Sequence, residues 1–128
     1  MNTELNTAKN SNDIPLQRGQ IYWIDWSPAR GSEQAGRRPA VIVQNDPFNQ
    51  NERYPNTIVA AVSTSGRIVP THVILEPDAQ NGLRDRSYVK CEQLITISKD
   101  RLQALIGTAD ESVMRQVDRA LKRALALI

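Results

Sequence analysis

The chain has 128 residues, with 16 Lys and Arg against 14 Asp and Glu and a formal net charge of +2. That length favours one domain with its own hydrophobic core. A hydrophobic content of 40% is typical of a globular protein, and no apolar run approaches the roughly 20 residues of a membrane helix. Residues 1–12 lack the pattern of a secretory signal, so we expect a cytoplasmic protein. The single cysteine, Cys91, excludes an internal disulfide and a cysteine cluster for zinc.

The sequence divides into an arm and a domain. Residues 1–17 are polar with isolated apolar positions, which predicts a flexible N-terminal arm. Residues 18–128 show the pattern of a single folded domain and hold 15 cations against 12 anions. Arginine accounts for 12 of the 16 cations in the chain, and it suits bidentate phosphate contacts better than lysine does. Composition alone still favours a solvated surface over a nucleic-acid site.

Short runs rich in β-branched and aromatic residues predict strands at residues 20–26, 39–44, 57–63, 72–75 and 87–97. The C-terminal part predicts two helices. Ser98 is expected to cap a helix over residues 99–106, with Gly107 after its end. Thr108 and Glu111 form a capping-box pattern before an amphipathic helix that extends to Ile128. We therefore expect a mainly β domain with C-terminal helices, in the α+β class.

A long polar loop, residues 27–38, leads directly into the second predicted strand. Arg38 ends this loop and Pro39 follows it. Because a proline ring restricts the backbone of the residue before it, Arg38 is predicted to hold a fixed guanidinium where the strand begins. Such a group suits a phosphate.

Hydroxyl side chains follow the third predicted strand. It ends at Ser63, and Thr64, Ser65 and Arg67 come soon after. Hydroxyls at a strand end bind a phosphate or cap a turn, and the turn is the commoner role.

The common enzyme motifs, including the Walker loop, the GxGxxG turn and HExxH, are missing from the sequence. His72 is the only histidine and a candidate general base, although a hydrogen-bonded strand histidine is the commoner role. Cys91 has no histidine near it in sequence, which favours a buried inert thiol.

A second loop carries the residue types that grip single-stranded nucleic acid. Aromatic rings stack on bases, and amide side chains read base edges. The loop offers Phe48, Asn49, Arg53 and Tyr54. Trp23 is a further stacking candidate, but Tyr22 and Trp23 point to opposite faces of a strand, so one of them is expected in the core.

Taken together, several short motifs resemble the MazF/PemK family of toxin endoribonucleases. They occur in the family's order and cover the chain from Arg18 to about Leu127. The motifs are residues 18–23 (RGQIYW), 31–34 (GSEQ), 36, 38–39 (RP), 44–46 (QND), 58–63 (IVAAVS), 70–73 (PTHV), 92–94 (EQL) and 96–97 (TI).

The resemblance implies an SH3-like β-barrel of the MazF/PemK/CcdB type, active as a homodimer without metal or cofactor. It implies cleavage of single-stranded RNA and inhibition by an acidic antitoxin of the MazE kind. The family's catalytic arginine corresponds to Arg38. Its hydroxyl partner, often threonine, corresponds to Ser63, with Thr64 adjacent. Further candidate RNA contacts are Gln34, Arg37, Asn45, Phe48, Thr64, Arg67, His72 and Gln93.

The chemistry of RNA fits this assignment. The 2′-OH is an internal nucleophile, so a cut needs alignment and charge stabilisation rather than an activated water, and it yields a 2′,3′-cyclic phosphate and a 5′-OH. Arg38 suits charge stabilisation but is a poor base, because arginine stays protonated. Glu33 and His72 remain alternative bases. Two noncatalytic alternatives are a gyrase poison like CcdB and an SH3-like module that only binds nucleic acid.

Overall fold

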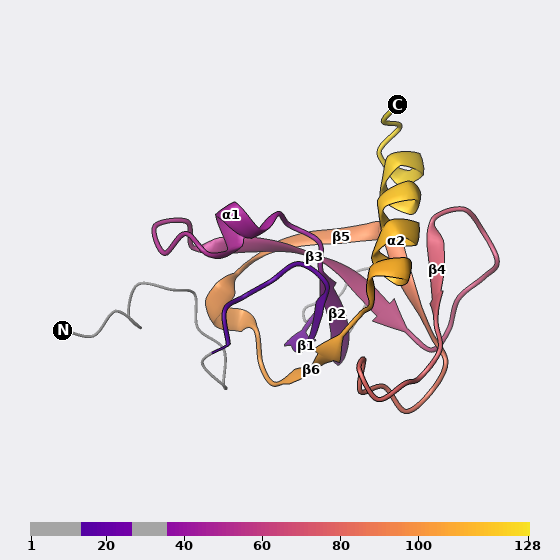
Figure 1. The fold of residues 1–128 in the computed structure, drawn as a ribbon, viewed down its shortest axis with the longest axis horizontal. Coiled ribbons are helices and arrows are strands. Elements are labelled where there is room, and N and C mark those ends of the chain that lie inside the picture. The colour runs from indigo at the N-terminus through magenta and orange to yellow at the C-terminus, as the bar shows by residue number, and fades with distance from the viewer. Residues whose placement is uncertain (1–13, 27–35) are drawn as a thin grey trace.

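A computed structural model of the protein describes residues 14–26 and 36–128. Six strands form one antiparallel sheet in the spatial order β4-β5-β3-β2-β1-β6 (Figure 1). Their bounds are β1 Gln20–Asp25, β2 Arg37–Ile42, β3 Asn56–Ser63, β4 His72–Leu75, β5 Ser87–Ser98 and β6 Leu105–Thr108. The five predicted strands are confirmed, with their ends moved by no more than two residues.

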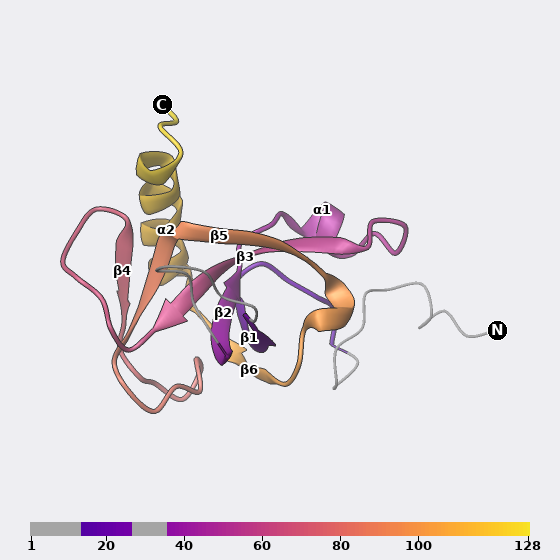
Figure 2. The same cartoon turned by 180° about the vertical axis from the view of Figure 1, so that it is seen from behind.

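The sheet curls because its longest strand, β5, bends in the middle. Ala60 of β3 pairs with Leu94, whereas the next residue, Ala61, pairs with Lys90. Residues 91–93 therefore bulge out of the ladder, and a bulge bends a strand and increases its twist. Figures 1 and 2 show β5 crossing from the α1 side of the sheet to the α2 side. The result is a half-barrel, which confirms the expected fold class.

The C-terminal helix α2, Glu111–Ala124, packs against β4 and β5. It confirms the predicted amphipathic helix, but its ends differ from the prediction. Asp110, not Thr108, is the N-cap, and its carboxylate accepts a hydrogen bond from the Val113 N–H at 2.8 Å. The helix ends before Ile128 because Ala126 has a φ of 57°, which is not helical. No helix in the described ranges is long and apolar enough to span a membrane.

The predicted helix over residues 99–106 is wrong. Ser98 does cap a helical turn, by accepting a hydrogen bond from the Asp100 N–H at 3.2 Å, but that turn is a 3-10 helix, Lys99–Arg101. The chain then extends into β6, which pairs with β1. Gly107 lies within this strand, where a Cβ atom would stand 2.4 Å from the Asn81 backbone. Edge pairing therefore overrides a local pattern that also fits a helix.

The core has two parts because successive strand residues point to opposite faces of the sheet. Ile21 belongs to the part that α2 covers, together with Val117. Tyr22 belongs to the other part and is fully buried. Leu16 also packs there at 1% exposure, although it comes from the segment predicted as an arm. Residues 1–13 of that arm lie outside the described residues.

Candidate active site

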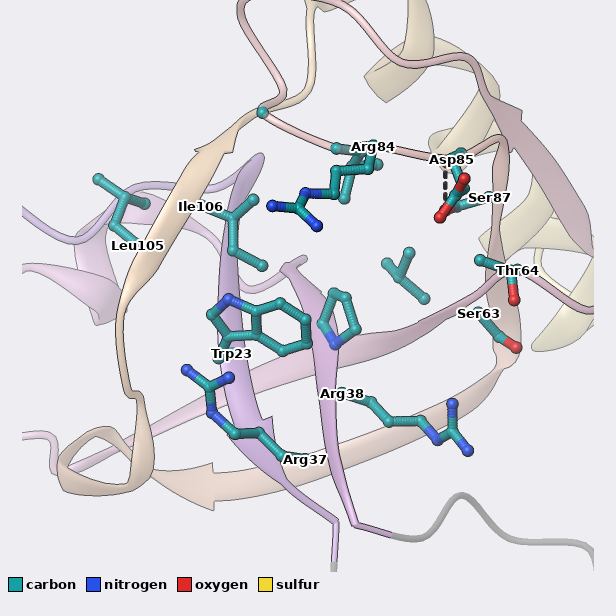
Figure 3. Close-up of a pocket in the computed structure, with 14 residues that line it drawn as sticks. Trp23, Arg37, Arg38, Ser63, Thr64, Arg84, Asp85, Ser87, Leu105 and Ile106 are labelled. Atoms are coloured by element: carbon teal, nitrogen blue, oxygen red, sulfur yellow. Dashed lines mark hydrogen bonds between the residues drawn. The ribbon is translucent and has the colours of Figure 1, made fainter.

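A cavity of about 600 Å³ opens between the sheet and the loop that joins β4 to β5. Four of the predicted site residues line it, namely Arg37, Arg38, Ser63 and Thr64. Trp23, considered for stacking, also lines it, whereas its neighbour Tyr22 is core, as expected from their opposite directions. Arg84 and Asp85 complete the charged lining (Figure 3).

Strand pairing places Arg38 and Ser63 near the same end of two neighbouring strands. β2 and β3 are aligned with Ala40 opposite Ala61. Arg38 lies two residues before Ala40 and Ser63 two residues after Ala61, so both stand just beyond the last paired residues at the same end of two neighbouring strands. Both residues line the cavity. Arg38 is the second residue of β2, which agrees with its predicted place where the loop meets the strand.

The two neighbouring hydroxyls differ in their surroundings. Ser63 is 8% exposed, and its hydroxyl oxygen caps the turn that follows β3. Thr64 is exposed. The predicted turn is therefore present, and it leaves the Ser63 hydroxyl proton available to donate to a ligand.

Arg37 is held in place by two contacts. Its guanidinium carbon lies 4.4 Å from the centroid of the Trp23 ring, a cation–π distance. Its Nε donates a hydrogen bond to Oε1 of Gln103 at 2.9 Å. Trp23 therefore already has an arginine over its ring, and a stacked base at that position would have to share or replace the contact.

His72 is not among the residues that line the cavity. Its Nδ1 accepts a hydrogen bond from the Arg67 N–H at 3.1 Å, and its Nε2 lies 2.9 Å from Oε2 of Glu92. An accepting Nδ1 assigns the ring proton to Nε2, which donates to Glu92. With both nitrogens engaged, the ring has no lone pair for a general base. Arg67, through the same turn, also lies away from the cavity lining.

The hydrogen bond from His72 affects the pKa of Glu92. Burial alone raises the pKa of Glu92, but hydrogen bonds from His72, from its own backbone N–H and from Thr71 bring that pKa below its usual value of 4.5. Glu92 is therefore charged at neutral pH. The pair is the hydrogen-bonded strand histidine that the sequence favoured over a catalytic one.

The loop predicted to recognise bases lies at the other end of β3 from the cavity. It begins with the short helix α1, Asp46–Asn49, which Asn45 caps by accepting a hydrogen bond from the Phe48 N–H at 2.9 Å. Phe48 is 49% exposed and stacks on Tyr54, with 5.1 Å between ring centroids. This loop comes before the first residue of β3, whereas Ser63 is the last residue of β3 and lies at the same end of the sheet as Arg38. The length of β3 therefore separates Asn45 and Phe48 from Arg38.

Two buried side chains hold the same loop. Asn49 is fully buried, donates to Gln44 O at 2.7 Å and accepts from Thr57 Oγ1 at 2.8 Å, so the expectation that it reads bases is wrong. Nζ of Lys99 donates to the carbonyls of Phe48 and Asn51 at 2.9 and 3.1 Å. Burial lowers the pKa of Lys99.

The remaining predicted residues fall elsewhere. Glu33 and Gln34 lie outside the described residues. Gln93 lies in the β5 bulge, away from the cavity lining. Cys91 is buried as predicted, and burial, followed by the charge of Glu92, raises its pKa to about 12. Within residues 14–26 and 36–128, no group of three His, Cys, Asp or Glu side chains is placed to hold a metal ion.

The model of one protein family, described as PemK-like, MazF-like toxin of type II toxin-antitoxin system, matches residues 17–125. The chain belongs to this family. A relative of this chain, endoribonuclease EndoA of Bacillus subtilis, is 41% identical over 115 residues, which cover 88% of this chain and 97% of that protein. The resemblance read from the sequence motifs is thereby confirmed.

Solved PemK/MazF structures share the fold. A mycobacterial endoribonuclease in complex with its cognate antitoxin superposes with a TM-score of 0.73 at 26% identity, covering 88% of this chain and 97% of that one. MazF of Deinococcus radiodurans gives a TM-score of 0.72 at 22% identity, covering 87% and 96%. The second likeness is one of fold alone.

Proposed function

We propose that this toxin is a sequence-specific endoribonuclease that cuts single-stranded RNA without a metal ion. The products are a 2′,3′-cyclic phosphate and a 5′-OH. One observation carries the proposal: Arg38 and Ser63, at the same end of the paired strands β2 and β3, line one cavity. The relative in Bacillus subtilis, named an endoribonuclease, supports the reaction class.

In the proposed reaction the RNA supplies its own nucleophile. The 2′-OH attacks the adjacent phosphorus, the bond from phosphorus to the 5′-oxygen of the next nucleotide breaks, and the departing 5′-oxygen takes up a proton from water to become the 5′-OH. Negative charge grows on the nonbridging oxygens during this step. The Arg38 guanidinium and the Ser63 hydroxyl are proposed to donate hydrogen bonds to those oxygens, and such preorganised donors act most strongly in the transition state.

The 2′-OH must also lose a proton. We propose Glu33, five residues before Arg38 in the sequence, as the base. The engaged nitrogens of His72 argue against that side chain. Asp85 is the one carboxylate among the described residues that line the cavity, which makes it the alternative base to test.

Cationic walls also suit an inhibitor. Arg37, Arg38 and Arg84 line the cavity with only Asp85 opposing them among the described lining residues. We propose that an acidic antitoxin segment occupies it, since carboxylates compete for a site built for phosphates. The mycobacterial relative solved with its cognate antitoxin supports this partner. We also propose that the protein is a cytoplasmic homodimer. The mass of the purified protein in analytical ultracentrifugation tests the dimer.

Replacement of Arg38 tests the proposed function. Arg38→Ala should lower the single-turnover cleavage rate about 10²- to 10³-fold, the usual effect of losing one transition-state donor. Arg115→Ala is the matched control, because Arg115 lies on α2 and pairs with Glu111 at 3.3 Å. Circular dichroism should show that both variants are folded. Equal cleavage by Arg38→Ala and the control would reject the assignment.

A further inference from the structure

Arg84 reaches the cavity from the side opposite β2. It belongs to the loop between β4 and β5, and in Figure 3 its side chain extends into the cavity from the upper wall while Arg37 and Arg38 lie along the lower one. The side chain is exposed. In the described part of the chain its guanidinium has no hydrogen bond or ion pair.

The loop that carries Arg84 is ordered by a buried asparagine. Asn81 is 2% exposed, and its Oδ1 accepts hydrogen bonds from the N–H groups of Asp78 and Leu83 at 3.1 and 3.0 Å. Its Nδ2 donates to the Glu76 carbonyl at 2.8 Å. Three backbone groups of the loop are therefore fixed by one side chain, and the last of them, the N–H of Leu83, belongs to the residue directly before Arg84.

Two glycines allow this loop to pack closely against β6. Gly82 has a φ of +70°, and a Cβ atom on it would lie 2.2 Å from the Ile106 carbonyl oxygen. Gly107 of β6 approaches the loop equally closely, and the Thr108 N–H donates to the Gln80 carbonyl at 2.9 Å. The loop and the strand thus act as one unit, so Arg84 projects from a fixed base.

We infer that Arg84 binds a backbone phosphate of the RNA next to the one that is cut, across the cavity from Arg38. The inference rests on the proposed function and adds a binding residue to it. A guanidinium without a partner among the described residues, on a preformed loop and facing a cationic wall, has the chemistry for a bidentate phosphate contact. Because it grips a phosphate that does not react, Arg84 should contribute to binding and not to the chemical step.

Arg86 provides a matched control in the same loop. It lies two residues further along, is exposed, and pairs through Nε with Oε2 of Glu76 at 3.1 Å. It is not among the residues that line the cavity. Arg84→Ala and Arg86→Ala therefore remove the same charge from the same loop, and only the first removes it from the proposed site.

The test measures binding apart from cleavage. The probe is a mixed-sequence pool of 2′-O-methyl oligoribonucleotides, which lack the attacking hydroxyl. Arg84→Ala should raise the Kd about 10-fold, in the range expected for one charged hydrogen-bonding group. The slope of log K against log salt should fall by about 0.7, the value for one phosphate contact on a single strand. Arg86→Ala should match the wild type in both, and Arg84→Lys should recover part of the loss.

Cleavage of a long single-stranded RNA completes the test. KM should rise with Arg84→Ala while kcat changes little. Equal Kd values and salt slopes for the Arg84 and Arg86 variants would overturn the inference, and so would a fall in kcat at unchanged Kd. A wild-type protein that binds the pool but cuts no RNA would count against the proposed function alone, because the binding comparison still decides the role of Arg84.

Discussion

The hydroxyl oxygen of Ser63 accepts a hydrogen bond from the backbone N–H of Ser65 at 3.1 Å. This bond fixes the χ1 orientation of a side chain that is nearly buried, and it leaves the hydroxyl proton to donate. Thr64, one residue on, is exposed. We therefore expect Ser63, rather than Thr64, to be the hydroxyl partner of Arg38.

Replacing each hydroxyl separately should reveal the difference. We expect Ser63→Ala to slow single-turnover cleavage by about 10²-fold through loss of one donor to the phosphate. It should also lower the free energy of unfolding by about 1 kcal/mol, because the turn loses its hydrogen bond. Thr64→Val should leave stability unchanged and reduce the rate less. A larger rate loss with Thr64→Val would exchange the two roles.

The proposed base should appear in the pH dependence of cleavage. Removing a general base typically costs about 10²- to 10⁴-fold in rate, so Glu33→Gln is expected to show a loss in that range. It should also abolish the acidic limb of the kcat profile, since that limb reports protonation of the base. Asp85→Asn should keep the limb. If Asp85→Asn removes it and Glu33→Gln does not, Asp85 is the base.

The pair of His72 and Glu92 should make stability depend on acidity. Hydrogen bonding holds the pKa of Glu92 below its usual value in the folded protein, so the folded state binds this proton less readily than the unfolded state. Its stabilising effect is present above the usual carboxylate pKa and is lost as the pH falls through the lowered one.

Unfolding in denaturant at two pH values checks this effect. At pH 7, Glu92→Gln should lower the free energy of unfolding by less than about 1 kcal/mol, because the pair is partly exposed. The difference from the wild type should shrink towards pH 3. A difference that grows on acidification would contradict the sign of the shift.

The contact between Gly107 and the β4–β5 loop should tolerate no side chain. A Cβ atom on Gly107 would meet backbone atoms of Gln80 and Asn81 within 2.5 Å. We expect Gly107→Ala to lower the free energy of unfolding by about 3 kcal/mol, as overpacked sites do. It should also weaken RNA binding, since the loop carrying Arg84 must move. An unchanged midpoint of thermal unfolding would contradict this prediction, because it would show that the loop moves to accept the methyl group without loss of stability.

Local sequence patterns located five of the six strands but not the edge strand β6. Strands such as β3 contain β-branched residues between turn residues, and they form where that pattern predicts. The sequence did not predict β6 because residues 99–106 also fit a helix. Only pairing with β1 decides between the helix and the strand. Gly107 looked like a helix end for the same reason. Its true role depends on Asn81, which is distant in sequence.

The sequence likewise predicted some residues of the candidate site and missed others. Arg38 and Ser63 were predicted because each stands in a motif, and the structure places both at the lining of one cavity. Arg84 was not, because the loop that carries it has no motif and reaches the cavity only through its contact with β6. Asn45 and Phe48 lie at the other end of β3 from Arg38, which residue type and motif alone do not show, and their RNA contacts stay predictions.

The measurement that tests the central claim most directly is cleavage of a long single-stranded RNA by the purified toxin in excess EDTA, with mapping of the cut sites and analysis of the new ends. The account predicts cuts at one short sequence, each leaving a 2′,3′-cyclic phosphate and a 5′-OH. Cleavage that stops in EDTA, or cuts that leave 5′-phosphates, would contradict a mechanism built on the 2′-OH, Arg38 and Ser63.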